Sequence, residues 1–332
     1  MKPVATALIG CGSISVAHGR AMASHRHLID LAAVCDSRED AAQRRARQLR
    51  TVARAWDAVL DDASIEAVVL CVPHDQHKTL AVEALDAGKH VLVEKPLTTN
   101  LPDADAMIEA AARNARILMV GQSQRFEPQH QLIHQQVTAG AIGPITMARA
   151  DHQQNLWVPP DHWLCDPARA GGGVILGSGI HRLDLLRWYC GDIEEVYCVH
   201  RPVSGRLDGA MEVNALVICQ HVSGVISQCA FNWAAYNHPW FEMLILYGQK
   251  GQLHNIGGVR IARSLSPGPH RFEQIKTASG PMTGFEGQLL HFIDCVRTGK
   301  TPLTDARDNR HSLAAAVACY ESARTGQPVK PL

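Results

Sequence analysis

The chain has 332 residues, which is long enough for two domains that each bury a hydrophobic core. Its 32 lysines and arginines balance 32 aspartates and glutamates, so the charge excludes the basic surface typical of nucleic-acid-binding proteins. No apolar run approaches the length of a membrane span, and the start of the chain lacks the pattern of a signal peptide. We therefore expect a cytoplasmic protein that binds neither nucleic acid nor membranes.

The sequence contains ten cysteines and 18 histidines, but neither residue type predicts a metal site. The cysteines form no C-x-x-C pair, and several lie within apolar runs, so we expect reduced residues of the core. Close histidine pairs such as His74 and His77 have no third ligand at a recognisable spacing. Histidines at the surface or in a substrate cleft are the better interpretation.

The first predicted element is a buried strand at Val4–Ile9, followed by glycines at positions 10 and 12 and by a helical pattern from residue 14. A second apolar run, residues 31–35, ends at Asp36. A strand, a Gly-x-Gly turn, a helix and a second strand that ends in an acid form the fingerprint of a dinucleotide-binding fold. Ser15 stands where this fingerprint has its third glycine.

This fingerprint predicts how a dinucleotide is held. The turn places backbone N–H groups and the positive end of a helix against the pyrophosphate. We expect it to bind through Gly10, Gly12, Ser13 and Ile14. Asp36 is expected to bind the ribose 2′-hydroxyl and to repel a 2′-phosphate, which favours NAD. Arg38 is within reach of such a phosphate, so NADP remains an alternative.

Strands and helices continue to alternate up to residue 121. Strands are predicted at residues 67–72, 90–94 and 117–120, and helices at 41–49, 76–87 and 103–114. The arginines in the first of these helices, beside acidic residues, are typical of a solvated face (Arg44, Arg45, Arg47 and Arg50). This alternation predicts an α/β domain with a parallel sheet and a ligand at the carboxyl ends of its strands.

Polar residues follow three of these strands, at the edge where the glycine turn also lies. We expect this edge to contact the cofactor through Cys71, Pro73, His74, His77, Glu94, Lys95, Gln122 and Arg125. A lysine held between a buried strand and a proline is unlike an ordinary surface lysine, which singles out Lys95. For Arg125, a structural ion pair between the domains is the alternative.

After residue 121 the pattern changes to an α+β domain. A helix is predicted at 128–139, a strand at 145–152, a loop rich in Trp and Pro, and a helix that contains His181 and ends before Gly191. Six short strands between 195 and 262 are joined by short turns, which indicates a mainly antiparallel sheet. Helices at 284–297 and 305–324 close the chain. We therefore divide it into a cofactor domain, 1–121, and a domain for substrate and oligomerisation, 122–332, whose last helix is free to pack back on the first domain.

In this order the motifs resemble those of the glucose–fructose oxidoreductase and inositol dehydrogenase (Gfo/Idh/MocA) family of NAD(P)-dependent sugar oxidoreductases. The motifs that match are Gly10–Ile14 with His18, Pro73 with His77, Glu94-Lys95-Pro96, Arg125-Phe126, Gly171-Gly172-Gly173 with His181 and Asp184, Tyr247–Gly251, and Ser322–Gly326. The resemblance covers nearly the whole chain. It implies a Rossmann domain, a second domain with an open, mainly antiparallel sheet, and a homodimer or homotetramer formed through that sheet. It also implies reversible oxidation of a secondary alcohol on a sugar, an inositol or a sugar derivative.

The family's catalytic lysine falls on Lys95 and its histidine on His181. We expect His181 to exchange the proton of the reacting hydroxyl and Lys95 to hydrogen-bond its oxygen. Many members carry an aspartate four residues before the histidine, where this chain has Gly177. Three interpretations follow: catalysis rests on Lys95 and His181 alone, a group such as Asp184 or Asp166 substitutes, or the chain binds its cofactor without turnover.

The helix around His181 and the preceding loop are expected to bind the substrate. The glycine run before His181 suggests close approach to a ligand rather than a histidine of the core. Asp184 lies on the same helix face, where it either fixes His181 or forms a structural salt bridge. The full set of expected substrate contacts is Lys95, Trp157, Trp163, Asp166, Arg169, His181 and Asp184. For the tryptophans, packing within a lid is the alternative.

Two further functions on the same fold stay open. One is an NAD-dependent glycosidase, in which transient oxidation beside the anomeric centre permits elimination. The other is a non-catalytic, nucleotide-binding regulator, which Gly177 favours and the intact Glu94-Lys95-Pro96 motif opposes.

Overall fold

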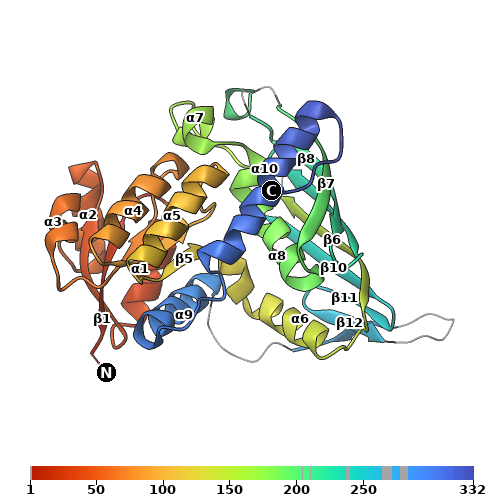
Figure 1. The fold of residues 1–332 in the computed structure, drawn as a ribbon, viewed down its shortest axis with the longest axis horizontal. Coiled ribbons are helices and arrows are strands. Elements are labelled where there is room, and N and C mark those ends of the chain that lie inside the picture. The colour runs from red at the N-terminus through yellow and green to blue at the C-terminus, as the bar shows by residue number, and fades with distance from the viewer. Residues whose placement is uncertain (1, 204, 210, 237–239, 264–270, 277–282) are drawn as a thin grey trace. The chain divides into compact units, whose positions relative to one another are not determined.

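The computed structural model describes residues 2–203, 205–209, 211–236, 240–263, 271–276 and 283–332 (Figure 1). Its contacts divide the chain into two compact units. The first comprises Met1–Phe126 with Met282–Arg310, and the second comprises Glu127–Pro281 with His311–Leu332. Among the described residues, no helix has both the length and the apolar character needed to cross a membrane.

The first unit is built on a five-stranded parallel sheet with the strand order β2-β1-β3-β4-β5. The strands are β1 (Val4–Ile9), β2 (Ile29–Cys35), β3 (Ala67–Leu70), β4 (His90–Glu94) and β5 (Leu118–Gly121). Strands β1, β3, β4 and β5 are short and almost wholly buried, because helices cover a parallel sheet on both faces. Strand β2 lies on one side of β1, and β3 lies on the other side. The strand order therefore changes direction at β1, and the turn after β1 lies at this switch point of the sheet, where such folds bind ligands.

Helices connect these strands and cover them. They are α1 (Ser15–Ser24), α2 (Glu39–Leu49), α3 (Trp56–Asp61), α4 (His77–Asp86), α5 (Leu101–Arg113) and α9 (Gly284–Thr298). Local sequence sets several of their ends. The side chain of Asn100 accepts a hydrogen bond from the backbone N–H of Asp103 and so caps α5. Thr283 and Glu286 form a capping box at the start of α9.

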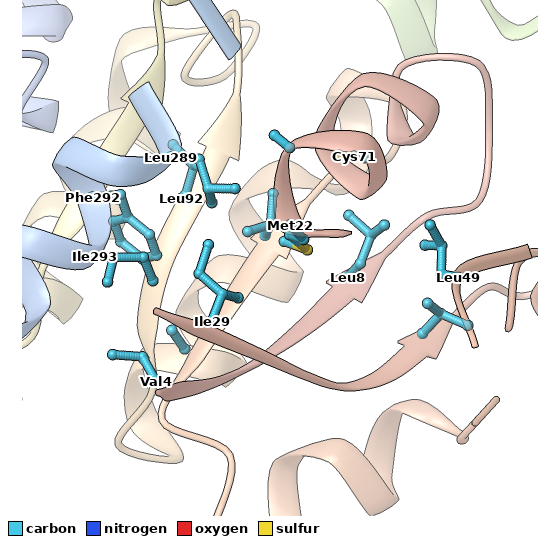
Figure 2. Packing of buried hydrophobic residues seen from close by; sticks show 14 of the residues in the cluster. Val4, Leu8, Met22, Ile29, Leu49, Cys71, Leu92, Leu289, Phe292 and Ile293 are labelled. Carbon is cyan, nitrogen blue, oxygen red and sulfur yellow. The ribbon is translucent and has the colours of Figure 1, made fainter. Parts of the chain in front are cut away.

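The core of the first unit includes a helix from far along the chain. Leu289, Phe292 and Ile293 of α9 are buried in the same apolar cluster as residues of β1, α1, β2 and β4. Figure 2 shows the α9 side chains pointing toward Val4 and Leu92. The segment after residue 282 is therefore part of the folding unit that begins at the N-terminus, although more than 150 residues separate the two.

The second unit is built on an eight-stranded sheet with the order β13-β12-β11-β10-β6-β9-β8-β7. The strands are β6 (Ile145–Gln153), β7 (Ile193–Arg201), β8 (Asn214–His221), β9 (Ile226–Asn232), β10 (Phe241–Gly248), β11 (Gly251–His254), β12 (Arg260–Arg263) and β13 (Glu273–Gln274). Neighbouring strands are antiparallel except for β6 and β9, which are parallel. The predicted class, a Rossmann domain followed by a mainly antiparallel domain, is confirmed.

Helices lie along one face of the large sheet (Figure 1). They include α6 (Pro128–Thr138), α8 (Ile180–Cys190) and the later part of α10 (Ala306–Thr325), while the short α7 (Pro167–Ala170) lies in the loop before α8. Strand β8 alternates accordingly: Ala215 and Val217 are buried, whereas Leu216 and Ile218 on the opposite face are 60% and 57% exposed. This alternation is typical of a sheet with one covered face and one open face.

Candidate active site

The glycine turn after β1 has the geometry that a dinucleotide requires. Gly10 has a φ of +88°, and a Cβ built on it would lie 2.3 Å from the carbonyl oxygen of Cys71, so only glycine fits. A Cβ on Gly12 would meet no described atom within 4 Å. Glycine at position 12 is therefore not required by the packing of this unit, but it leaves open the space in which a diphosphate approaches the backbone. Ser15, which stands in place of the third glycine of the fingerprint, fits here because its buried hydroxyl donates a hydrogen bond to the carbonyl of Gly12 at 2.6 Å.

Asp36 is anchored beside this turn. Its Oδ2 accepts a hydrogen bond from the backbone N–H of Cys11 at 2.7 Å, and its Oδ1 accepts one from the N–H of Arg38 at 2.9 Å. The side chain of Arg38 is largely exposed, with its Nε 4.0 Å from the carboxylate. The carboxylate is thus fixed where the adenosine ribose of a bound dinucleotide is expected.

A buried pair of side chains lies at the end of β4. Nε2 of His18 is 2.7 Å from Oε1 of Glu94, and Oε2 of Glu94 accepts a hydrogen bond from the backbone N–H of Lys95 at 3.2 Å. Burial alone lowers the pKa of His18, but Cys71 and the Glu94 carboxylate outweigh burial and raise it to about 10. Glu94 is held from the other side by β5, where a Cβ on Gly121 would come within 3.2 Å of its carboxyl group.

Lys95 directly follows this strand and is half-buried. Burial disfavours the charged ammonium and lowers the pKa of Lys95, although the negative charge of Glu94 opposes the shift. A lysine with a lowered pKa gives up its proton more readily than one at the surface, which is the property expected of a group that handles a proton near neutral pH.

The loops after β3 and β4 are joined by the ring of His77. This ring is fully buried, with Nδ1 2.8 Å from the carbonyl oxygen of Pro96 and Nε2 3.1 Å from that of Val72. Burial lowers the pKa of His77, and a neutral ring donates to only one of the two carbonyls. Because His77 ends the loop after β3, its contact with Pro96 in the loop after β4 links two loops of the cofactor edge. The ring of His74, also buried, packs against it, and Cys71 and Pro73 belong to the same loop.

Gln122 and Arg125 follow β5 and contact the segment after α9. The side-chain nitrogen of Gln122 donates to Oδ1 of Asn309 at 3.3 Å. Arg125 is buried, donates to the carbonyl oxygen of Leu303 at 3.1 Å and forms an ion pair of 2.9 Å with Asp308. All of these partners belong to the first unit, so these contacts of Arg125 tie the end of its sheet to the start of α10.

In the second unit, the glycine run before α8 packs against the protein itself. A Cβ on Gly172 would lie 2.0 Å from the hydroxyl of Tyr320, and one on Gly173 would lie 1.9 Å from the carbonyl oxygen of Glu212. The carboxylate of Glu212 also accepts from the backbone N–H groups of Gly173 and Ile175 and from Tyr320. Packing within the protein therefore explains these two glycines without a ligand beside them.

A π-helical turn, Ile175–Gly179, joins this run to α8 and explains the glycine at position 177. A Cβ on Gly177 would lie 2.2 Å from Cη2 of Trp233. Trp233 is 3% exposed, and its indole N–H donates to the hydroxyl of Ser178 at 2.8 Å. The indole thus fills the space into which a side chain at position 177 would project. Short π-helical turns are frequent at functional sites.

His181 and Asp184 are both buried in α8. Oδ1 of Asp184 accepts a hydrogen bond from the hydroxyl of Ser312 at 2.8 Å, and that hydroxyl accepts one from Nη1 of Arg187 at 2.8 Å. The described contacts therefore link Asp184 to Arg187 through Ser312. Lys95 belongs to the first unit and His181 to the second.

The loop expected to bind substrate is more ordered than its sequence suggests. Trp157 is 72% exposed, whereas Trp163 is half-buried at the start of a short 3₁₀ helix, Trp163–Cys165. Asp166 is exposed and caps α7, because its Oδ1 accepts from the N–H of Ala168 at 3.0 Å. Arg169 is half-buried within α7.

In each unit, one residue that contacts a candidate site residue was not singled out from the sequence: Trp233 in the second unit and Arg45 in the first. Trp233 lies at the end of a predicted strand, and nothing local indicates that it faces Gly177. Arg45 was assigned to a solvated helix face; it is half-buried, and its Nη2 also lies 3.3 Å from the carbonyl oxygen of Gly12. The helical periodicity does indicate that Arg45 faces the protein, because the buried residues Ala41, Ala42 and Leu49 lie on the same side of the helix as Arg45. In the described part of the chain, no group of three or more metal-ligating side chains is assembled.

Comparison with protein-family models decides the family. Residues 4–122 match the model of an oxidoreductase family with an NAD-binding Rossmann fold, and residues 130–254 match the model of the Gfo/Idh/MocA C-terminal domain. The chain belongs to the Gfo/Idh/MocA family. The predicted family, the Rossmann fold and the NAD cofactor are thereby confirmed.

Curated and solved Gfo/Idh/MocA relatives align along nearly the whole chain. D-apiose dehydrogenase of Paraburkholderia graminis is 28% identical, covering 98% of this chain and 88% of its own. The NAD⁺-dependent scyllo-inositol 2-dehydrogenase of Bacillus subtilis is also 28% identical, with coverage of 98% and 96%. The crystal structure of an oxidoreductase domain protein from Kribbella flavida superposes with a TM-score of 0.92 at 25% identity, covering all of both chains.

Proposed function

We propose that the protein is an NAD-dependent dehydrogenase that oxidises a secondary alcohol of a sugar, an inositol or a related derivative. Its relatives bear the names of sugar and inositol dehydrogenases and align with both units. The observation that carries the proposal is the half-buried Lys95, which follows a buried His18–Glu94 pair at the sheet edge that holds the NAD-binding turn.

The residues of the first unit fit this cofactor. We propose that the turn at Gly10 and Gly12 binds the diphosphate of NAD and that Asp36 binds its ribose hydroxyls. When bound, NAD supplies the acceptor for hydride. His77, with its two backbone carbonyls, positions the loops on which the remaining expected contacts lie. NADP remains the less favoured cofactor, because the carboxylate of Asp36 repels a 2′-phosphate.

We assign the proton of the reacting hydroxyl to Lys95 and His181. Histidine is the most frequent general acid–base residue in enzymes, and we propose that His181 accepts this proton during oxidation and returns it during reduction. Lys95 donates a hydrogen bond to the reacting oxygen and stabilises the charge that develops on it. Because the indole of Trp233 fills the space beside Gly177, these two groups act without a carboxylate at that position.

We further propose that residues 1–121 bind the cofactor and that the substrate contacts come from residues 122–332. Trp157 and Trp163 offer apolar faces for a sugar ring, and Asp166, Arg169 and Asp184 offer polar groups for its hydroxyls.

The open face of the eight-stranded sheet is proposed to bind a second copy of the chain. Leu216 and Ile218 of β8 pair with Val199 and Tyr197 of the neighbouring β7, and all four are exposed. Ile226 of β9 and Met147 of β6 pair with each other and are also exposed. Exposed apolar side chains on four neighbouring strands are typical of a protein interface. We therefore propose a homodimer or homotetramer.

The test is NADH formation with NAD⁺ and a panel of polyols, aldoses and glycosides. We expect NADH to accumulate with at least one of them, and both Lys95→Met and His181→Gln to lower kcat by about 10²- to 10⁴-fold with little change in the Kd of NAD⁺. Lys78→Met is the matched control, because Lys78 is exposed and pairs with Asp103 in α5. Release of a sugar without net NADH would instead identify a glycosidase. NAD⁺ binding without turnover on any compound would identify a regulator.

A further inference from the structure

One arginine of α2 reaches back to the glycine turn. Nη2 of Arg45 lies 3.3 Å from the carbonyl oxygen of Gly12 and 3.4 Å from that of Cys11. Its Nη1 donates to the side chain of Gln48 at 2.8 Å. Its Nε is buried and has no hydrogen-bond partner among the residues that the structure describes. The half-buried guanidinium therefore contacts the turn with one nitrogen while its Nε is shielded from solvent.

The neighbouring Arg44 shows the contrast. Its side chain is 55% exposed and forms a surface ion pair with Asp40, one helical turn earlier. Exposed pairs of this kind contribute little to stability. Two adjacent arginines of the same helix thus have different environments, and only Arg45 contacts the cofactor turn.

The two carbonyl contacts determine where backbone N–H groups point. In a trans peptide the C=O of one residue and the N–H of the next point in opposite directions. Since Arg45 binds the carbonyls of Cys11 and Gly12 on the side of α2, the N–H groups of Gly12 and Ser13 point away from α2. Two further contacts restrain the turn: the carbonyl of Gly12 also accepts from Ser15, and the N–H of Cys11, in the preceding peptide, donates to Asp36.

We propose that Arg45 is a positioning residue for the cofactor diphosphate: it fixes the peptides of the glycine turn so that their N–H groups face the phosphates. A guanidinium beside two carbonyl oxygens also polarises these peptides and adds a positive charge next to the anion site. The proposal rests on the NAD-binding turn and not on the choice of alcohol. A binding experiment therefore tests it separately from the proposed dehydrogenase reaction.

The test is calorimetric binding of NAD⁺, ADP-ribose and adenosine to the full-length protein and its variants. Arg45→Met keeps most of the apolar stem but removes both charge-assisted hydrogen bonds. We expect its Kd to rise at least about tenfold for NAD⁺ and ADP-ribose, which contain the diphosphate, and less than about twofold for adenosine, which does not. Arg44→Met is the matched control, for which all three Kd values stay within about twofold of wild type.

A conservative variant keeps the test decisive if Arg45→Met lowers stability. Arg45→Lys retains the charge but lacks the planar fork, so we expect a loss of affinity between those of wild type and Arg45→Met. The wild-type Kd for NAD⁺ should also rise more steeply with salt than that of Arg45→Met. Two results would overturn the proposal: unchanged NAD⁺ affinity in a folded Arg45→Met, or an equal loss of affinity for adenosine and ADP-ribose.

Discussion

Replacing Gly177 by alanine tests how tightly the turn before α8 packs against the sheet. In a helix interior, alanine is favoured over glycine by about 1 kcal/mol, so the substitution would stabilise the protein if the site had room. The structure indicates the opposite. The new Cβ would lie 2.2 Å from Cη2 and 2.6 Å from Cζ2 of Trp233, whereas carbon atoms in contact are normally about 3.5–4.0 Å apart.

The expected loss of stability arises because the indole of Trp233 must move to make room for the new methyl group. Trp233 is buried, and its indole N–H is bonded to Ser178, so a shift of more than 1 Å strains the packing and weakens that hydrogen bond. Overpacking of this kind costs about 1–3 kcal/mol, and the hydrogen bond contributes about 1 kcal/mol. After the helix gain is subtracted, we expect Gly177→Ala to lower the free energy of unfolding by about 1–3 kcal/mol.

Denaturant and thermal unfolding measure this difference, with Gly19→Ala as the matched control. A Cβ on Gly19 of α1 would lie 2.8 and 3.0 Å from the two methyl carbons of Leu49, the end of a flexible side chain, so we expect a change within about 1 kcal/mol. In a Trp233→Ala background, the effect of Gly177→Ala should reverse and become neutral or stabilising. A Gly177→Ala variant at least as stable as wild type would refute the packing argument.

The remaining predictions concern charge and assembly. The folded-state pKa of His18, about 10, exceeds its usual 6.5, so the stability it contributes is complete below pH 6.5 and is lost as pH rises through 10. The free energy of unfolding of wild type should therefore fall by on the order of a few kcal/mol across this range relative to that of His18→Gln, and parallel pH profiles would contradict the charged pair. Leu216→Glu with Ile218→Glu should convert an oligomer to monomers by light scattering, whereas Val222→Glu, in an exposed turn, should not; an unchanged mass would exclude the open sheet face as the interface.

Much of the fold can be predicted from the sequence because its signals are local. The strand at Val4–Ile9 was placed correctly from an unbroken apolar run, and the strand at His90–Glu94 likewise. The glycine turn and Asp36 were found because the dinucleotide fingerprint spans only one β-α-β unit. In these elements, the local sequence alone indicates which residues are buried and where the backbone needs glycine.

Features that depend on distant partners were not predictable in this way. Helix 284–297 was expected from its periodicity, but not its packing into the core of the first unit. The glycines at 172 and 173 were attributed to a ligand, because nothing in the local sequence shows that Tyr320 and Glu212 approach them. The pairing of Gly177 with Trp233 joins positions 56 residues apart and becomes visible only when the sheet is formed.

Lys95 and His181 are proposed to act on one substrate hydroxyl. A crystal structure of the protein with NAD⁺ and a substrate from the panel would show whether they do. We expect Nζ of Lys95 and a ring nitrogen of His181 each to lie about 3 Å from the same hydroxyl oxygen, with the diphosphate on the turn at Gly12. A bound substrate whose reacting hydroxyl contacts neither side chain would contradict this proposal.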